Sequence, residues 1–167
     1  KGMKYKVVTI TAKEKLCFMD ETKCDPGHCP YARGHFDRVN DAVYELWTTK
    51  SRYDRETIQE QARKWQVCPF EMCLDLAVWV DAVICDYNYV FDPTVHLKRF
   101  FGEGAGGDYI FLIDEAHNLA ERGREMYSAS LCREDVLLVR RALKERAPRI
   151  YRSLGKLNNQ LKELQEE

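Results

Sequence analysis

Hydrophobic positions change their spacing from block to block along the chain, and the spacing predicts alternating strands and helices. The β-branched run YKVVTIT, residues 5–11, has the composition of a buried strand. In the segment HFDRVNDAVYELW, residues 35–47, apolar residues instead recur at steps of three and four, which places them in one stripe on a helix. The members of this stripe are Phe36, Val39, Val43, Leu46 and Trp47.

Two further helices are predicted after this one. Asp54 is a suitable N-cap for the first of them. Its apolar positions are Ile58, Ala62 and Trp65. Pro69 suits the first position of the next helix, where an N–H would have no partner, so Cys68 is the expected N-cap. We expect that helix to run to about Trp79.

Two more strand-like runs follow residue 80. The first is DAVICDYNYVF, residues 81–91, and the DPTVHLKRFF that follows it, residues 92–101, is expected to be helical. GEGAGGD, residues 102–108, is a flexible loop that lacks the Lys-Ser or Lys-Thr pair of a phosphate-binding loop. The second run is YIFLIDEAHNL, residues 109–119. It has the pattern of a buried parallel strand whose carboxyl end faces a site.

The last part of the chain predicts two helices separated at Pro148, which breaks or restarts the helix. The apolar face before Pro148 is formed by Val136, Leu137, Val139 and Leu143. After it, apolar residues alternate at spacings of four and three, at Ile150, Leu154, Leu157, Leu161 and Leu164. Such a stripe needs a partner helix, and packing within the same protein is the favoured explanation.

Length and composition are those of a globular chain with one ordinary domain or two small ones. Its 167 residues are 45% hydrophobic, which is enough for a real core. No apolar run approaches the roughly 20 residues of a membrane helix, so we expect an intracellular, cytoplasmic location and no membrane partner. In a reducing compartment, seven cysteines are better explained by metal binding or catalysis than by disulfides.

Charge is distributed unevenly over the chain. The net charge of −1 excludes a uniformly basic nucleic-acid coat. Residues 1–68 carry 13 Lys and Arg against 10 Asp and Glu, or +3, whereas the remainder carries 13 against 17, or −4. A nucleic acid would therefore meet the first part, although charges scattered over solvated faces explain the counts equally well.

Four cysteines form the strongest candidate metal site. Cys17, Cys24 and Cys29 have six and four residues between them, and Cys68 follows after 38 more. Four thiolates bind either zinc or a [4Fe-4S] cluster. Structural zinc usually uses at least one close C-x2-C pair, which is absent here, so the spacing favours the cluster and leaves zinc as the alternative.

The segment 17–29 is polar and turn-rich, with too little apolar surface to hold its own shape, so bound metal would have to fix it. Cys73 and Cys85 are better explained as packed core residues. His28 is the substitute ligand if the metal is zinc, although a surface histidine is the simpler explanation.

A second candidate site follows the last apolar run. Asp114 and Glu115 leave a predicted buried strand, where unpaired charge is costly, so a cation is expected nearby. In a Mg-nucleotide site Asp114 would hold the metal through its water shell, Glu115 would polarise the attacking water, and His117 would relay the nucleotide state. The alternative is an ordinary helix start with Asp114 as N-cap.

The order of these features resembles the iron-sulfur helicases of superfamily 2, the XPD and DinG group. The resemblance covers residues 5–135 and is carried by TAKEKLC, the next two cysteines, VCPFE, VDAVICDYNYVFDP and FLIDEAHN. It implies ATP-dependent 5′ to 3′ translocation and unwinding of DNA in repair, with Mg²⁺ and ATP. By this resemblance, the ligands of a [4Fe-4S] cluster correspond to Cys17, Cys24, Cys29 and Cys68. The DEAH box of the family corresponds to Asp114, Glu115, Ala116 and His117.

The resemblance also implies an α/β fold and a domain order: part of a RecA-like P-loop motor domain with an inserted, mostly α-helical iron-sulfur domain and a C-terminal helical segment. The expected parts are a RecA-like strand (1–16), the iron-sulfur domain (17–79), the RecA-like part with the DEAH box (80–130) and the start of a helical arch domain (131–167). Because the sequence lacks a Walker A loop, we expect a piece of a larger enzyme that is inactive without the remainder of the helicase polypeptide.

We also hypothesise a cluster-stabilised wedge with a basic edge that contacts single-stranded and forked DNA. Its candidate residues are Arg33, His35, Arg38, Arg63 and Lys64. Tyr31 could stack on bases, and so could Phe36 and Trp65, although these two are expected in the core. The competing classes are a zinc-binding interaction module without catalysis and, last, a nuclease, which would need a lysine close behind the acids.

Overall fold

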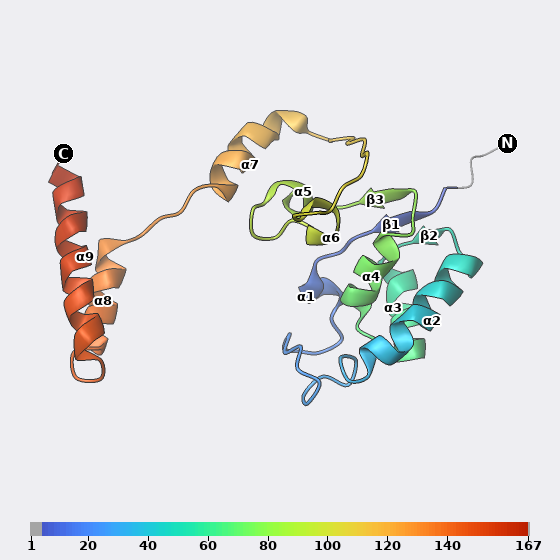
Figure 1. Cartoon of the computed structure of the whole chain (residues 1–167), viewed down its shortest axis with the longest axis horizontal. Coiled ribbons are helices and arrows are strands. Elements are labelled where there is room, and N and C mark those ends of the chain that lie inside the picture. Colours follow the sequence, from blue (N-terminus) through green and yellow to red (C-terminus); the bar gives the residue numbers. More distant parts are fainter. Residues whose placement is uncertain (1–4, 167) are drawn as a thin grey trace. The chain divides into compact units, whose positions relative to one another are not determined.

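The chain folds into two compact units, which divide after Leu112 (Figure 1). The computed structural model describes residues 5–166, so residues 1–4 and 167, which belong to the first and last predicted domains, lie outside the described part. The class is mixed α/β, with a small parallel sheet and many helices. Among the described helices, none combines the length and the apolar character needed to cross a membrane.

A parallel three-stranded sheet, ordered β2-β1-β3, lies in the first unit. The strands are β1 (Val7–Thr9), β2 (Arg52–Tyr53) and β3 (Ala82–Ile84). In β1, Val8 pairs with Tyr53 on one side and Val83 on the other. Val8 and Tyr53 are fully buried, as expected for a parallel sheet covered by helices. The strand predicted at 5–11 is therefore confirmed in its centre, whereas the run at 81–91 forms a strand only over Ala82–Ile84.

Helices of the first unit pack with the sheet around one hydrophobic core. Their bounds are α1 (Lys13–Leu16), α2 (His35–Thr49), α3 (Arg55–Trp65), α4 (Pro69–Ala77), α5 (Asn88–Phe91) and α6 (Lys98–Phe101). Asp54 caps α3 as predicted, because its Oδ1 accepts the Thr57 N–H at 3.1 Å. Cys68 is the N-cap of α4, also as predicted, and α4 ends at Ala77, slightly earlier than expected.

The stripe on α2 differs from its prediction at one end. Val39 and Leu46 are buried, but Phe36 is 85% exposed. The buried side chain of this first turn is His35 instead. Phe36 therefore lies outside the core, contrary to the prediction.

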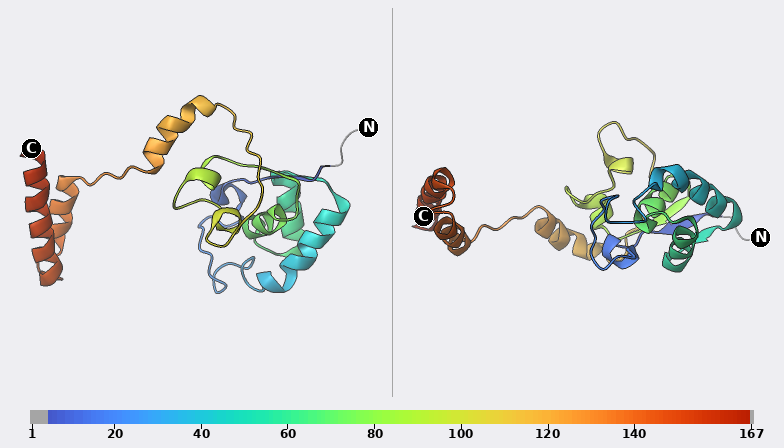
Figure 2. Two further views of the ribbon diagram at one scale, coloured as in Figure 1. Left: turned by 45° about the horizontal axis from the view of Figure 1, so that its top comes forward. Right: turned by 90° about the horizontal axis from the view of Figure 1, so that it is seen from below.

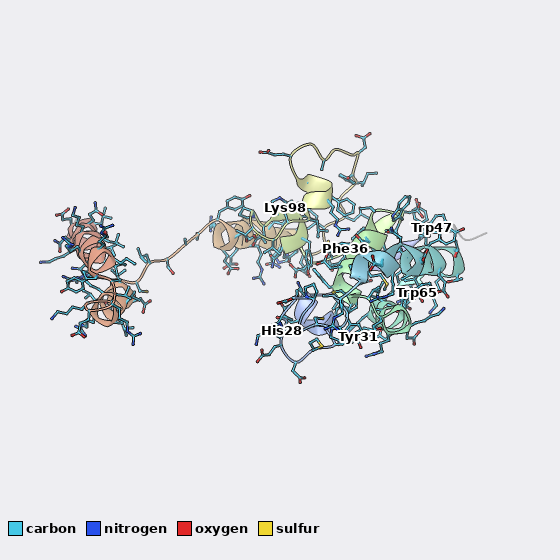
Figure 3. All side chains as sticks on the ribbon, turned by 60° about the horizontal axis from the view of Figure 1, so that its bottom comes forward. His28, Tyr31, Phe36, Trp47, Trp65 and Lys98 are labelled. Atoms are coloured by element: carbon cyan, nitrogen blue, oxygen red, sulfur yellow. The ribbon has the colours of Figure 1, made fainter. Side chains whose placement is uncertain are left out.

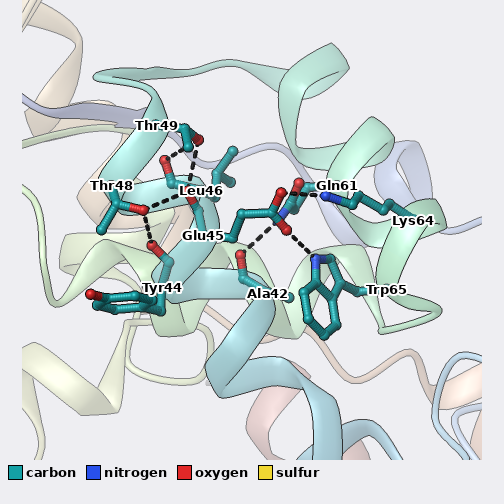
Figure 4. Close-up of polar contacts among 9 residues, drawn as sticks. All are labelled: Ala42, Tyr44, Glu45, Leu46, Thr48, Thr49, Gln61, Lys64 and Trp65. Carbon is teal, nitrogen blue, oxygen red and sulfur yellow. Dashed lines mark hydrogen bonds and ion pairs between the residues drawn. The ribbon is translucent and has the colours of Figure 1, made fainter.

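A cluster of polar side chains joins α2 to α3, and we call it the Glu45 cluster (Figure 4). The Glu45 carboxylate accepts hydrogen bonds from Trp65 Nε1 at 2.7 Å and Gln61 Nε2 at 3.3 Å, and it also binds Lys64 Nζ. Gln61 Nε2 additionally donates to the Ala42 carbonyl at 2.9 Å. One carboxylate thus connects three side chains of the neighbouring helix.

The apolar run at 109–113 is not a strand, contrary to the prediction. The sheet of the described residues has three strands and does not include it, and Ile110 and Leu112 are 92% and 94% exposed. Its aromatic residue Tyr109 instead contacts Phe100 and Phe101, with ring centroids 5.9 and 5.8 Å away. A buried parallel strand needs a hydrogen-bonding neighbour, and none of the three strands supplies one to this run.

The second unit is helical. It contains the short 3-10 helix η1 (Ala116–Asn118), α7 (Leu119–Met126), α8 (Arg133–Ala142) and α9 (Pro148–Glu166). Helices α8 and α9 lie side by side in all views (Figures 1 and 2). Arg133 Nε donates to Asn158 Oδ1 at 2.9 Å, and the Arg140 guanidinium lies 4.3 Å from the Tyr151 ring centroid. The restart at Pro148 is thus confirmed, and α8 is a partner helix for α9, although Ile150 and Leu164 of the apolar stripe are exposed.

Candidate metal centre

The four predicted cluster cysteines line one pocket of about 350 Å³ in the first unit, which we call the cysteine pocket. Cys17 directly follows α1, and Cys68 precedes α4. Cys24 and Cys29 lie in the loop between α1 and α2. All four are free thiols. The fold thus brings together cysteines from three separate places in the chain.

The loop that carries Cys24 and Cys29 is held in part by its own hydrogen bonds. Asp25 Oδ1 accepts the Gly27 N–H at 2.7 Å, and the Asp25 carbonyl accepts the Cys29 N–H at 2.8 Å. Arg33 Nε donates to the Pro26 carbonyl at 3.1 Å. These bonds fix the turn before Cys29, whereas Cys24 is exposed.

Aromatic side chains make up much of the wall of the cysteine pocket. The Phe18 and Tyr31 rings lie 4.8 Å apart, and the Arg63 guanidinium lies 4.4 Å from the Phe18 centroid. Figure 3 shows Tyr31 and His28 on the loop, with Phe36 on α2 and Trp65 on α3. Apolar walls of this kind keep water away from the thiols on one side.

The surroundings of the pocket shift the pKa values of two side chains, Cys68 and Lys13. Burial raises the pKa of the Cys68 thiol, while the backbone amides of Glu71 and Phe70 act in the opposite direction. The pKa of Lys13 is raised, chiefly by its hydrogen bond with the Cys24 side chain, against the lowering effect of burial. A lysine ammonium therefore faces the sulfur of a predicted ligand.

The sequence analysis did not identify Lys13 as a site residue. A signal was present, because Lys13 precedes Cys17 by one helical turn in TAKEKLC.

The cysteines outside the predicted ligand set have different surroundings. Burial raises the pKa of Cys73 to about 12, so its thiol stays protonated in the core, as the packing explanation predicts. Cys132 is exposed.

The donor set fits an iron-sulfur cluster. Four cysteine thiols are the usual ligands of a [4Fe-4S] group, whose irons occupy more space than a single ion, and four cysteines line this pocket. Within residues 5–166, no group of three or more His, Cys, Asp and Glu side chains is arranged to hold one metal ion. His28, the substitute zinc ligand, is exposed, with Nδ1 3.3 Å from Asp25 Oδ2.

The acids of the DEAH sequence lie in the second unit. Asp114 Oδ1 accepts the Glu115 N–H at 3.0 Å, and His117 Nδ1 lies 3.2 Å from Glu115 Oε2. Glu115 has φ of +50°, a left-handed conformation that costs a residue other than glycine about 1–3 kcal/mol. Asp114 caps no helix, since Glu115 precedes η1 and Asn118 precedes α7, so the helix-start alternative is not observed.

The candidates for DNA contact have different surroundings. Arg38 donates to the carbonyls of Trp65, Arg33 and Gln66 at 3.0, 2.8 and 2.6 Å, so it holds the end of α3 to the loop. Lys64 belongs to the Glu45 cluster. His35 is only 4% exposed, which removes it from the surface candidates, because a contact with DNA requires access.

Comparison with known proteins identifies the chain as part of a superfamily 2 helicase of the XPD and DinG type. The family model DEAD_2 matches residues 3–136, and the chain belongs to this family. It is 29% identical over 116 residues to "Fanconi anemia group J protein homolog" of Gallus gallus, covering 69% of this chain and 9% of the relative. It is also 28% identical over 85 residues to "Regulator of telomere elongation helicase 1 homolog" of Anopheles gambiae, covering 51% of this chain and 8% of the relative. The chain thus spans under a tenth of the length of these relatives.

Proposed function

We propose that this chain is the cluster-bearing and DEAH-bearing region of an ATP-dependent DNA helicase that moves 5′ to 3′. The observation that carries the proposal is the cysteine pocket, where four thiols from separate parts of the chain meet in a member of the DEAD_2 family. The Anopheles gambiae relative is named as a helicase, which supports the activity.

Cys17, Cys24, Cys29 and Cys68 would hold a [4Fe-4S] cluster, which supplies cross-links between the segments that it joins. Cys29 is buried and already fixed by the Asp25 turn, so it offers a preorganised ligand. Cys68 ties the loop to the start of α4. Lys13 balances the negative charge of the thiolates. The role of the cluster in this proposal is structural.

Asp114 and Glu115 would serve the nucleotide once the remaining parts of the motor are present. In this proposal Asp114 orients Mg²⁺ through water, Glu115 polarises the attacking water, and His117 relays the nucleotide state through its contact with Glu115. The left-handed backbone at Glu115 supports a functional role, because such strain persists mainly where a site requires it.

DNA would run along the basic edge of the iron-sulfur region. Of the surface candidates, Arg33 and Arg63 lie beside the pocket wall, and Arg38 acts indirectly by holding the loop. Single-stranded and forked DNA are the proposed partners, together with the remainder of the helicase polypeptide.

DNA-stimulated ATP hydrolysis and unwinding by the full-length protein test this proposal. We expect both activities in the parent and a loss of at least 100-fold in Glu115→Gln, because the amide cannot polarise the attacking water as a carboxylate does. Glu121→Gln, in the exposed helix α7, is the control and should leave the rate unchanged. Full activity in Glu115→Gln, or none in the parent, would contradict the proposal.

A further inference from the structure

His35 presents a feature that the proposed ligands do not explain. Its ring is almost completely buried and forms part of the wall of the cysteine pocket. His35 Nδ1 accepts the backbone N–H of Cys68 at 3.2 Å. Since Nδ1 accepts this bond, the proton of the neutral ring is on Nε2.

The Nε2 atom of His35 is buried and has no hydrogen-bond partner within the described residues. In the described part of the first unit it is the one buried side-chain nitrogen or oxygen atom of this kind. A buried donor without an acceptor loses its hydration without compensation, and native proteins rarely leave one so. Such a donor therefore indicates an acceptor that belongs to the site.

The surroundings of the ring restrict what this acceptor can be. One edge of His35 faces Cys68, and the Phe36 ring meets it edge-on with centroids 5.2 Å apart. The pocket that it lines also contains the four thiols.

We infer that His35 is a positioning residue of the metal centre, whose Nε2–H donates a hydrogen bond to a sulfur atom of the cysteine-bound cluster. Its two nitrogens then have separate tasks: Nδ1 fixes the backbone of the ligand Cys68, and Nε2 stabilises negative charge on sulfur. Hydrogen bonds to cluster sulfurs raise the reduction potential, because the reduced cluster carries more negative charge. The inference rests on the proposed function, since it requires the cluster.

Two substitutions separate the tasks of the two nitrogens. In His35→Asn, the asparagine side chain places a carbonyl oxygen near the position of Nδ1 and so keeps the acceptor for the Cys68 N–H. It has no donor at the position of Nε2. Gln in His35→Gln places an NH₂ group near the position of Nε2 and restores the donor. His28→Asn is the control, because His28 is an exposed histidine on the loop that precedes α2.

The experiment measures iron, acid-labile sulfide and the midpoint potential of the anaerobically purified chain and its variants. We expect His35→Asn to shift the reduction equilibrium about tenfold toward the oxidised form, which is about 59 mV lower for a one-electron couple. His35→Gln should recover most of this shift, and His28→Asn should match the parent.

Two results would overturn the inference in distinguishable ways. An intact cluster whose potential is unchanged in His35→Asn would refute the role of His35 and leave the cluster in place. A parent chain without iron and sulfide would refute both the cluster and the inference. If the His35 variants fail to fold, the ¹⁵N NMR spectrum of the parent protein tests the hydrogen bond instead. We expect a slowly exchanging, hyperfine-shifted Nε2–H, and a rapidly exchanging proton without that shift would refute the hydrogen bond.

Discussion

Asp54 shows how one residue begins a helix and links its stability to pH. Its carboxylate caps α3, and hydrogen bonding from Thr57 lowers its pKa. A carboxyl with a lowered folded pKa stabilises the protein above its unfolded pKa of about 3.9, and this contribution is lost as pH falls through the folded value.

We therefore predict that Asp54→Ala lowers the free energy of unfolding by about 0.5–2 kcal/mol at pH 7, measured by urea denaturation. The deficit should shrink as pH falls below about 4, because the parent then loses its charged cap. Asp54→Asn, which caps without charge, should remain close to the parent at pH 7. A deficit that is the same at pH 3 and pH 7 would contradict the assignment.

Local sequence signals located some site residues and missed others. Asp54, Cys68 and Pro69 were predicted because each signal depends only on neighbours in the chain. The buried position of His35 was not predicted, since its partner is the amide of a residue 33 positions later. Contacts of this kind depend on the tertiary fold. The spacing of residues within one segment does not predict them.

At the scale of elements, the Glu45 cluster determines how α2 and α3 are held together. Hydrogen bonds from Lys64 and then Trp65 lower the pKa of Glu45, so the carboxylate is the stabilising form above pH 4.5. We predict that Glu45→Ala lowers the urea midpoint at pH 7 and that Glu45→Gln lowers it less, because Gln can still accept from Trp65 Nε1.

Glu60→Ala is the matched control for this prediction. Glu60 lies on α3 and pairs with Lys50 at 3.7 Å, but both side chains are exposed, and such pairs contribute little. Its urea midpoint should stay near that of the parent. Equal effects of Glu45→Ala and Glu60→Ala would show that the cluster contributes no more than a surface ion pair.

Helices were predicted more reliably than strands, and the reason is physical. The starts of α3, α4 and α9 follow from capping residues and prolines that act within one turn. The run at 109–113 has the composition of a strand, yet a strand also requires a neighbour to pair with. Composition therefore indicates what this segment can form and not where its partner lies.

At the scale of the whole molecule, the proposal divides the chemistry between this chain and the rest of a longer protein. The 167 residues contain an acidic DEAH sequence but no glycine-rich loop followed by Lys-Ser or Lys-Thr. We therefore predict that the purified chain has no ATPase activity above background, with or without single-stranded DNA, in a phosphate-release assay. Turnover that Glu115→Gln abolishes would contradict this prediction.

The central claim is that Cys17, Cys24, Cys29 and Cys68 hold one [4Fe-4S] cluster. Measurement of iron, sulfide and zinc in the anaerobically purified chain tests it most directly, with Cys68→Ser as the variant and the exposed Cys132→Ser as control. The account predicts about four irons and four sulfides per chain in the parent and in Cys132→Ser, and loss of both in Cys68→Ser. Stoichiometric zinc from an iron-replete preparation, or full iron content in Cys68→Ser, would contradict it.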